Sequence, residues 1–193
     1  MQERDTLKVI NHWQKISRLV PLVEPWFDKL LLSKSLRDLA QCGYNIVNWD
    51  MINAFVERWH HEMSLFHLPH GEMMITLDDV TCLLHILIRG TFSDHERIGK
   101  EEALDMLVEK LGVTPESAMA EIDKTRGCHV RYSYLDRVFR NEIRRAREAC
   151  GYLKQVSIHQ RFAMRAYILY LVGINFLFGY KCYLHLYHLP TVL

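Results

Sequence analysis

The sequence predicts a mainly α fold, a compact multi-helix domain with one small β-hairpin around residues 64–76. Apolar residues recur three and four positions apart over most of the chain, which is the pattern of helices that bury one face. Residues 64–76 break this pattern, because two short runs there flank a cluster of turn residues. Hydrophobic residues make up 49% of the 193 residues and charged residues 24%, values typical of a globular chain rather than a disordered one.

The first helix patterns lie in the N-terminal half of the chain. One helix is predicted to begin near Ser33 or Ser35 and to stop before Gly43. Residues 48–59 place apolar side chains on one helical face, and Asn48 or Asp50 can cap that helix. Trp59 belongs to the same face, so we expect it in the core rather than as a binding platform.

The predicted hairpin turns through residues 69–72, a Pro-His-Gly-Glu cluster that suits a four-residue loop. Thr76 then caps a helix, with its hydroxyl accepting the backbone N–H of Asp78 or Asp79. Both acids also suit the first turn, where the helix dipole favours negative charge. The apolar stripe of this helix is predicted to be Val80, Leu83, Leu84 and Leu87.

Residues 91–99 are predicted as a loop that leads into two further helices. The helix pattern of residues 100–111 ends at Gly112, because glycine adopts the left-handed conformation of a helix end without steric cost. Thr114 caps the next helix, and Pro115 takes its first position, where no N–H is needed.

The C-terminal half predicts a basic helix and an apolar one. Ser133 is expected to cap the basic helix, which runs to about Cys150. Ser157 and Gln160 form a capping-box pattern at the start of the apolar helix. Residues 166–180 are almost wholly apolar, but they are fewer than the roughly 20 residues that a membrane-spanning helix needs. We therefore predict a buried core helix and no membrane partner.

Charge is spread unevenly along the chain. Residues 124–165 contain eleven Lys or Arg and three acids, a local net charge of +8. The whole chain carries +1, so the remainder carries −7. Such an asymmetry indicates a charged partner or contacts between oppositely charged parts of the chain.

The cysteines give no metal or disulfide pattern. Their number is odd, no two are close in sequence and no CxxC pair exists, so we expect free thiols in a reducing compartment. The five are Cys42, Cys82, Cys128, Cys150 and Cys182.

Residues 55–90 read FVERWHHEMSLFHLPHGEMMITLDDVTCLLHILIRG. This run resembles the signature of the plant mobile domain family, also called aminotransferase-like, which includes maintenance-of-meristems-like proteins. The match extends more weakly to residues 165–173. The motif residues that we single out as structural or recognition positions are Arg58, Trp59, Phe66, His67, Pro69, Gly71, Glu72, Thr76 and Asp79.

The resemblance divides the chain into three parts. It implies an N-terminal segment at residues 1–29, a partial plant mobile domain at residues 30–178 and a divergent apolar tail at residues 179–193. Residues 176–193 read FLFGYKCYLHLYHLPTVL, where the family continues with a polar stretch. The sequence therefore looks like a truncated copy, and one alternative is an inactive fragment of a transposon-derived gene.

The resemblance also implies a function. It implies a non-enzymatic plant nuclear protein of meristem maintenance, transcription regulation and transposon silencing that acts through protein–protein interaction. A phosphatase-like nuclear protein is one implied partner. The implied location is the nucleus, with the cytoplasm as the alternative for a truncated form.

Enzyme and metal sites are disfavoured by the residues themselves. No glycine-rich phosphate loop or placed lysine supports a pyridoxal phosphate site, so no cofactor and no catalytic residue is predicted. Four histidines and one glutamate lie close together in the sequence near the hairpin, but their spacing matches no standard metal site. A cross-strand hydrogen bond explains His67 and Glu72 more simply. The cluster comprises His60, His61, His67, His70 and Glu72.

Arg58 is interpreted as structural, in an ion pair with Glu72 or Asp79 that holds the hairpin against a helix. The planar guanidinium of arginine suits a carboxylate well. The alternative is a recognition surface for a peptide or a nucleic acid.

The basic helix at residues 133–150 is the candidate for nucleic-acid contact, because arginines can neutralise phosphates. The alternative without a functional role is a solvent-exposed helix face whose arginines pair with acids from the rest of the chain. The run could also serve as a nuclear-localisation patch. The candidate contact residues are Arg137, Arg140, Arg144, Arg145 and Arg147.

Overall fold

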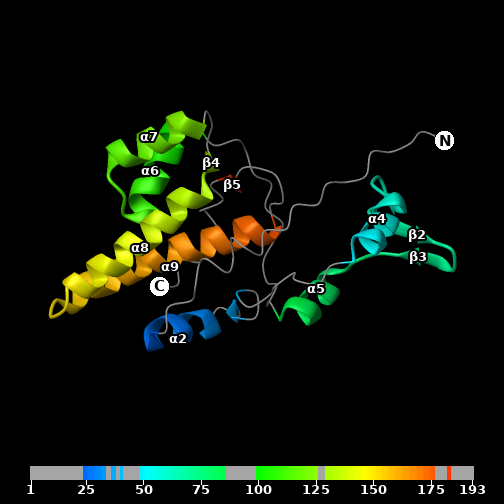
Figure 1. Cartoon of the computed structure of the whole chain (residues 1–193), viewed down its shortest axis with the longest axis horizontal. Helices are drawn as coiled ribbons and strands as arrows, with labels where there is room; N and C mark the ends of the chain where they lie inside the picture. Colours follow the sequence, from blue (N-terminus) through cyan, green and yellow to red (C-terminus); the bar gives the residue numbers. More distant parts are fainter. Residues whose placement is uncertain are drawn as a thin grey trace. The chain divides into compact units, whose positions relative to one another are not determined.

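Helices dominate the described part of the chain, as predicted, and a three-stranded and a two-stranded antiparallel sheet accompany them (Figure 1). The contacts divide the chain into two compact units, Met1–Thr91 and Phe92–Leu193. The computed structural model describes residues 24–33, 36, 37, 40, 48–85, 99–125, 129–176, 182 and 183.

The helices described in the first unit are α2 (Pro25–Ser33), α4 (Trp49–Glu57) and α5 (Leu77–Leu84). Asn48 caps α4 as predicted, because its side-chain oxygen accepts the N–H of Met51 at 3.1 Å. The helix predicted over residues 33–42 lies largely outside the described residues, and α2 was not predicted.

The sheet has strand order β1-β2-β3, with β1 (Trp59–His60), β2 (Leu65–Leu68) and β3 (Gly71–Met73) all antiparallel to their neighbours. The predicted hairpin is confirmed in β2 and β3. Its four-residue loop was wrong, because Leu68 pairs with Gly71 and leaves a two-residue turn. Strand β1 was not predicted, since two residues are too few to show an alternating pattern.

Thr76 caps α5 as predicted. Its hydroxyl accepts the N–H of Asp79 at 3.2 Å. The predicted apolar stripe was wrong at Leu83, which is 76% exposed. Helix α5 ends at His85, whose positive φ of 52° stops the helix, and residue 87 lies outside the described residues.

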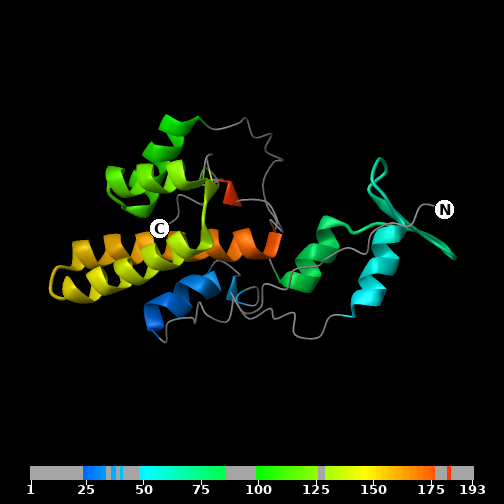
Figure 2. The ribbon, with the colours of Figure 1, turned by 45° about the horizontal axis from the view of Figure 1, so that its top comes forward.

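The second unit is built on two long helices that run antiparallel and side by side (Figures 1 and 2). Near one end, Nδ1 of His159 lies 2.7 Å from Glu142, and near the other the hydroxyl of Tyr132 donates to the carbonyl of Gly173 at 2.8 Å. The elements described in this unit are α6 (Lys100–Leu111), α7 (Pro115–Thr125), β4 (His129–Val130), α8 (Tyr132–Glu148), α9 (Leu153–Phe176) and β5 (Cys182–Tyr183).

The predicted ends of α6 and the start of α7 are confirmed. Gly112 adopts φ 64° and its N–H bonds to the carbonyl of Val108. Thr114 accepts the N–H of Ser117 at 3.4 Å, with Pro115 at the first position of α7. The loop predicted before α6 lies outside the described residues except for its last residue.

The starts of α8 and α9 were predicted wrongly. Helix α8 begins at Tyr132, so Ser133 lies inside it, and Cys150 beyond its end is exposed. Helix α9 begins at Leu153, and the hydroxyl of Ser157 donates back to the carbonyl of Lys154 within it. A serine inside a helix makes this local bond when packing elsewhere sets the helix start.

The apolar part of α9 is a buried core helix, as predicted. Burial raises the pKa of Tyr167 to about 12, because the phenolate would lose its hydration there. Of the helices in the described part of the chain, none is long and apolar enough to cross a membrane. The buried hydrophobic residues of α9 are Ala163, Met164, Ala166, Tyr167, Ile168, Leu169, Tyr170 and Leu171.

Candidate functional site

Phe66 anchors the motif segment (residues 55–85), because rings from two elements pack on it. The ring of Phe55, on α4, meets it edge-on at 5.5 Å between centroids. The ring of Trp59, on β1, lies 4.8 Å away. Aromatic contacts of this kind fix the sheet against the helix that precedes it.

The other motif residues in the hairpin shape its turn. Nδ1 of His67 lies 3.4 Å from the carboxylate of Glu72 on the facing strand, so the predicted cross-strand contact is present. Pro69 opens the turn, where its fixed φ is suitable. Gly71 closes it with φ 143°, a conformation that side chains disfavour.

Thr76 and Asp79 form a reciprocal capping box at the start of α5. Oδ2 of Asp79 accepts the backbone N–H of Thr76 at 2.8 Å and its hydroxyl at 2.7 Å. The backbone hydrogen bond and then the hydroxyl bond lower the pKa of Asp79. These two motif residues therefore set where α5 begins.

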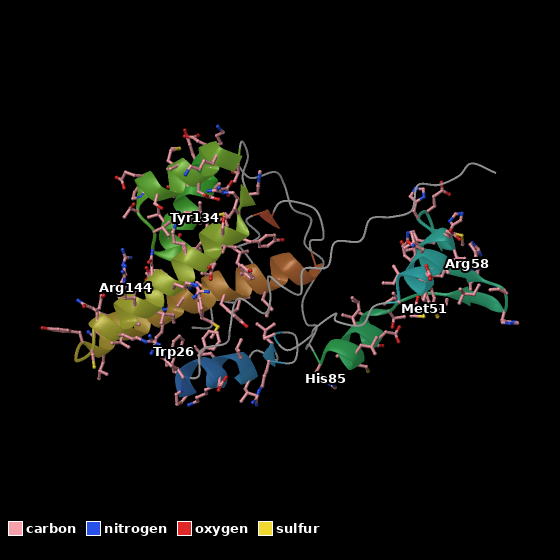
Figure 3. All side chains as sticks on the ribbon, viewed as in Figure 1. Trp26, Met51, Arg58, His85, Tyr134 and Arg144 are labelled. Carbon is pink, nitrogen blue, oxygen red and sulfur yellow. The ribbon has the colours of Figure 1, made fainter. Side chains whose placement is uncertain are left out.

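Two predictions about the motif were wrong. Within residues 48–85, the guanidinium of Arg58 pairs with neither predicted carboxylate; it donates to the carbonyl of Ala54 at 2.8 Å and so closes the last turn of α4 (Figure 3). Trp59 leaves the helix for β1 and is 41% exposed rather than core. Trp59 does not belong to the apolar face of the helix because α4 ends at Glu57, with Arg58 as its C-cap.

A run of exposed apolar side chains follows the hairpin, and we name it the motif surface. Its members belong to β3, to the link after it and to α5, and their exposed fractions run from 41% to 76%. Large exposed apolar side chains that are gathered together often mark an interaction site. The motif surface comprises Met73, Met74, Ile75, Leu77 and Leu83.

The motif surface lies in an acidic stretch of sequence. Residues 59–85 contain four acids and no Lys or Arg. Glu62, Glu72, Asp78 and Asp79 are all exposed. A basic partner would therefore be attracted to this segment.

The histidines near the hairpin make no recognisable metal centre. The rings of His60 and His67 meet edge-on at 5.3 Å between centroids. Throughout the described ranges, no group of three His, Cys, Asp or Glu side chains is placed to hold a metal ion.

In the second unit, four arginines of α8 fall in one line, which we name the arginine row. Their spacing of three, four and three residues repeats close to the helical period, so the row extends for about 15 Å along the axis. All four side chains are exposed, and Figure 3 shows Arg144 projecting from α8. The row consists of Arg137, Arg140, Arg144 and Arg147.

Acids on α8 itself balance part of this charge. Arg140 lies 2.8 Å from Asp136, and Arg144 lies 3.8 Å from Glu148. Exposed pairs of this kind contribute little and are easily exchanged for a phosphate. The guanidinium of Arg137 sits over the ring of Tyr134 at 5.1 Å.

Arg145 has a different role from the arginine row. It donates at 2.7 Å to Glu142, whose side chain is only 2% exposed and also meets His159 at 2.7 Å. A buried carboxylate needs such partners, so Arg145 is held for stability. The candidate nucleic-acid residues thus separate into four exposed arginines that form the row and Arg145, which pairs with a buried carboxylate.

Sequence reasoning missed the second buried carboxylate, Glu121. Both its oxygens accept from the guanidinium of Arg131, at 2.8 and 2.6 Å, and Oε1 also accepts the backbone N–H of Arg131 at 3.0 Å. Burial favours a higher pKa, but the bonds and charge of Arg131 outweigh it and lower the pKa of Glu121. No local pattern marks this pair, because ten residues separate its members.

Comparison with known proteins shows which family this chain resembles. The model of the plant mobile domain matches residues 37–191. Protein MAIN-LIKE 1 of Arabidopsis thaliana is 38% identical over 127 residues, which are 66% of this chain and 23% of that protein. Protein MAINTENANCE OF MERISTEMS of the same plant is 30% identical over 176 residues, 89% of this chain and 31% of that protein.

A further Arabidopsis thaliana relative is the serine/threonine-protein phosphatase 7 long form homolog. It is 29% identical over 119 residues, which are 62% of this chain and 8% of that protein. The chain thus spans a third or less of the length of the curated relatives that it matches. No solved structure matches it.

Proposed function

The chain belongs to the plant mobile domain family, and from this membership we propose that it is a non-enzymatic nuclear module that acts by binding other proteins. The processes that we assign to it are meristem maintenance, transcription regulation and transposon silencing. The similarity to the proteins MAIN-LIKE 1 and MAINTENANCE OF MERISTEMS supports this assignment.

The observation that carries the proposal is the motif surface. In the motif segment, Phe66, Gly71 and the Thr76–Asp79 box each have a structural task. The motif surface has none: Ile75 is 61% exposed and Leu83 is 76% exposed. Burying such side chains against a partner would stabilise a complex.

The partner that we propose is a phosphatase-like nuclear protein. One relative carries the name of a serine/threonine-protein phosphatase, and the match covers only 8% of it. A chain that joins a module of this family to a phosphatase suggests that the two also bind each other when they are separate chains.

Replacing Ile75 and Leu83 with aspartate should weaken partner binding about tenfold or more, because charges cannot enter an apolar interface. The measurement is binding of the full chain to a recombinant phosphatase 7-type protein, alongside quantitative pull-downs from plant nuclear extract. Met119→Asp is the matched control, since Met119 is an exposed apolar residue of α7. Equal retention by all three proteins would refute a role for the motif surface.

The arginine row favours a second function, binding to nucleic acid. Phosphate contacts give an affinity that is independent of sequence and falls steeply with salt. The four exposed arginines of the row lie in one line, as a ligand with repeated phosphates requires.

Arg137→Ala together with Arg144→Ala should weaken binding to a synthetic oligonucleotide and lower the salt slope by about 1.4 to 1.8, since each phosphate contact contributes about 0.7 to 0.9. Fluorescence anisotropy across a salt series measures both quantities. Lys29→Ala with Lys100→Ala removes the same charge elsewhere and should change the slope little. A slope that both double variants share would contradict the assignment to the arginine row.

A further inference from the structure

Strand β3 is the outer strand of the sheet. The order β1-β2-β3 gives it one neighbour, and no other strand in the described part of the chain pairs with its far side. Its three residues are all exposed, and the two residues that follow it are exposed as well. An outer strand of this kind presents backbone donors and acceptors to any extended segment nearby.

The hydrogen bonds of β2 show which groups of β3 point outward. The N–H of His67 donates to the carbonyl of Arg58 at 2.9 Å, so His67 faces β1. Its neighbours Phe66 and Leu68 therefore face β3, because backbone groups alternate sides along a strand. Their partners Met73 and Gly71 face back toward β2.

By the same alternation, Glu72 and Met74 direct their backbone groups away from β2. The N–H of Met74 has no hydrogen-bond partner among the described residues. Natural outer strands are protected from pairing by being very short, by charged side chains such as lysine, by proline or by a bulge, and β3 is short and carries Glu72. Residues 71–76 read GEMMIT and contain no lysine or proline.

We propose that β3 accepts an extended, basic segment of a partner protein as a fourth strand of the sheet. The unpaired backbone groups select an extended segment, since only a strand can bond Glu72 and Met74 together. The acidic stretch around them selects basic residues, and it disfavours a second copy of this chain, whose own β3 is equally acidic. This inference rests on the proposed protein-binding role of the motif surface and names the kind of segment that docks there.

The test uses an eight-residue synthetic peptide that alternates valine and lysine. In amide NMR of the full chain, the peptide should protect the N–H groups of Glu72 and Met74 from exchange. The N–H of Met73, already bonded to β2, should keep the protection it has. The same peptide with glutamate in place of lysine, or N-methylated along one edge, should bind about tenfold more weakly.

Variants at position 74 separate backbone from side chain. Met74→Pro removes the outward N–H and should weaken peptide binding about tenfold. Met74→Ala keeps that N–H and removes only side-chain contacts, so its loss of peptide affinity should be smaller than that of Met74→Pro. An unchanged exchange pattern for the aromatic core around Phe66 shows that both variants remain folded.

The outcomes distinguish this inference from the role on which it rests. No binding of the lysine peptide, or equal binding by Met74→Pro and by the N-methylated peptide, overturns strand addition. If replacing Ile75 and Leu83 with aspartate still weakens binding of the phosphatase-type protein, the motif surface docks its partner through side chains, and the proposed function stands. If substitutions in the motif surface also leave partner binding unchanged, both proposals fail.

Discussion

Gly112→Ala should lower the free energy of unfolding by about 3 kcal/mol, a large part of the stability of an ordinary domain. Two costs add at this position. Gly112 has φ 64°, which a side chain disfavours by about 1–2 kcal/mol. A Cβ there would also overlap the ring of Phe162 on α9, and overpacking costs about 1–3 kcal/mol.

Urea unfolding followed by circular dichroism measures this loss. Gly151→Ala is the matched control, because Gly151 has φ 106° but no atom within 4 Å of its added Cβ. That variant should show the backbone cost alone. The clash itself is isolated by a cycle that also changes Phe162.

Replacing Phe162 with a smaller side chain gives a second check. In a cycle of Gly112→Ala and Phe162→Leu, the double variant should be more stable than the sum of the single losses predicts, because the smaller side chain can yield. Additive losses would show that Phe162 does not oppose a side chain at position 112.

Glu121→Ala should lower the free energy of unfolding by about 2 kcal/mol at neutral pH. Glu121 is 2% exposed and accepts three hydrogen bonds from Arg131. The guanidinium of Arg131 can return to water, because its side chain is 47% exposed. The backbone N–H of Arg131, lying between α7 and α8, would lose its acceptor, and this loss dominates the cost.

The pH dependence follows from the lowered pKa of Glu121. Its ordinary value is 4.5, and in the folded protein the hydrogen bonds and charge of Arg131 outweigh burial and hold the pKa below that value. Below pH 4.5 the unfolded chain therefore binds the proton more readily. The stabilisation is complete above that pH and is lost as the pH falls through the folded pKa.

Glu121→Gln tests this linkage with little change of shape. At pH 7 the variant should be less stable than the original protein. As the pH falls below 4.5, the gap between the two should narrow, because protonated Glu121 resembles glutamine. Urea unfolding at a series of pH values gives both curves. A gap that stays constant across the series would show that the charge of Glu121 does not stabilise the fold.

Several element boundaries could be predicted because the interactions that set them span four residues or fewer. Asn48 and Thr114 accept N–H groups three positions ahead, Thr76 exchanges bonds with Asp79, and Gly112 bonds back to Val108. The hairpin was predicted for the same reason, since its turn residues are adjacent. The motif residues of the hairpin could therefore be placed on their elements from sequence.

Other boundaries could not be predicted because distant residues decide them. Ser133 and Ser157 carry good capping chemistry, yet α8 begins one residue before the first and α9 begins four residues before the second. Glu121 of α7 holds the backbone N–H of Arg131, directly before α8. The packing of α9 along α8 extends α9 past a local signal.

The sequence alone determined the mainly α composition, the hairpin, the helix ends with local caps and the excess of arginine in α8. Only the tertiary structure decided that Trp59 is exposed, that Arg145 pairs with the buried Glu142, and that the other four arginines form an exposed row. The physical reason is that local hydrogen bonds are encoded within one or two turns, whereas burial and charge pairing depend on which distant side chains the fold brings together.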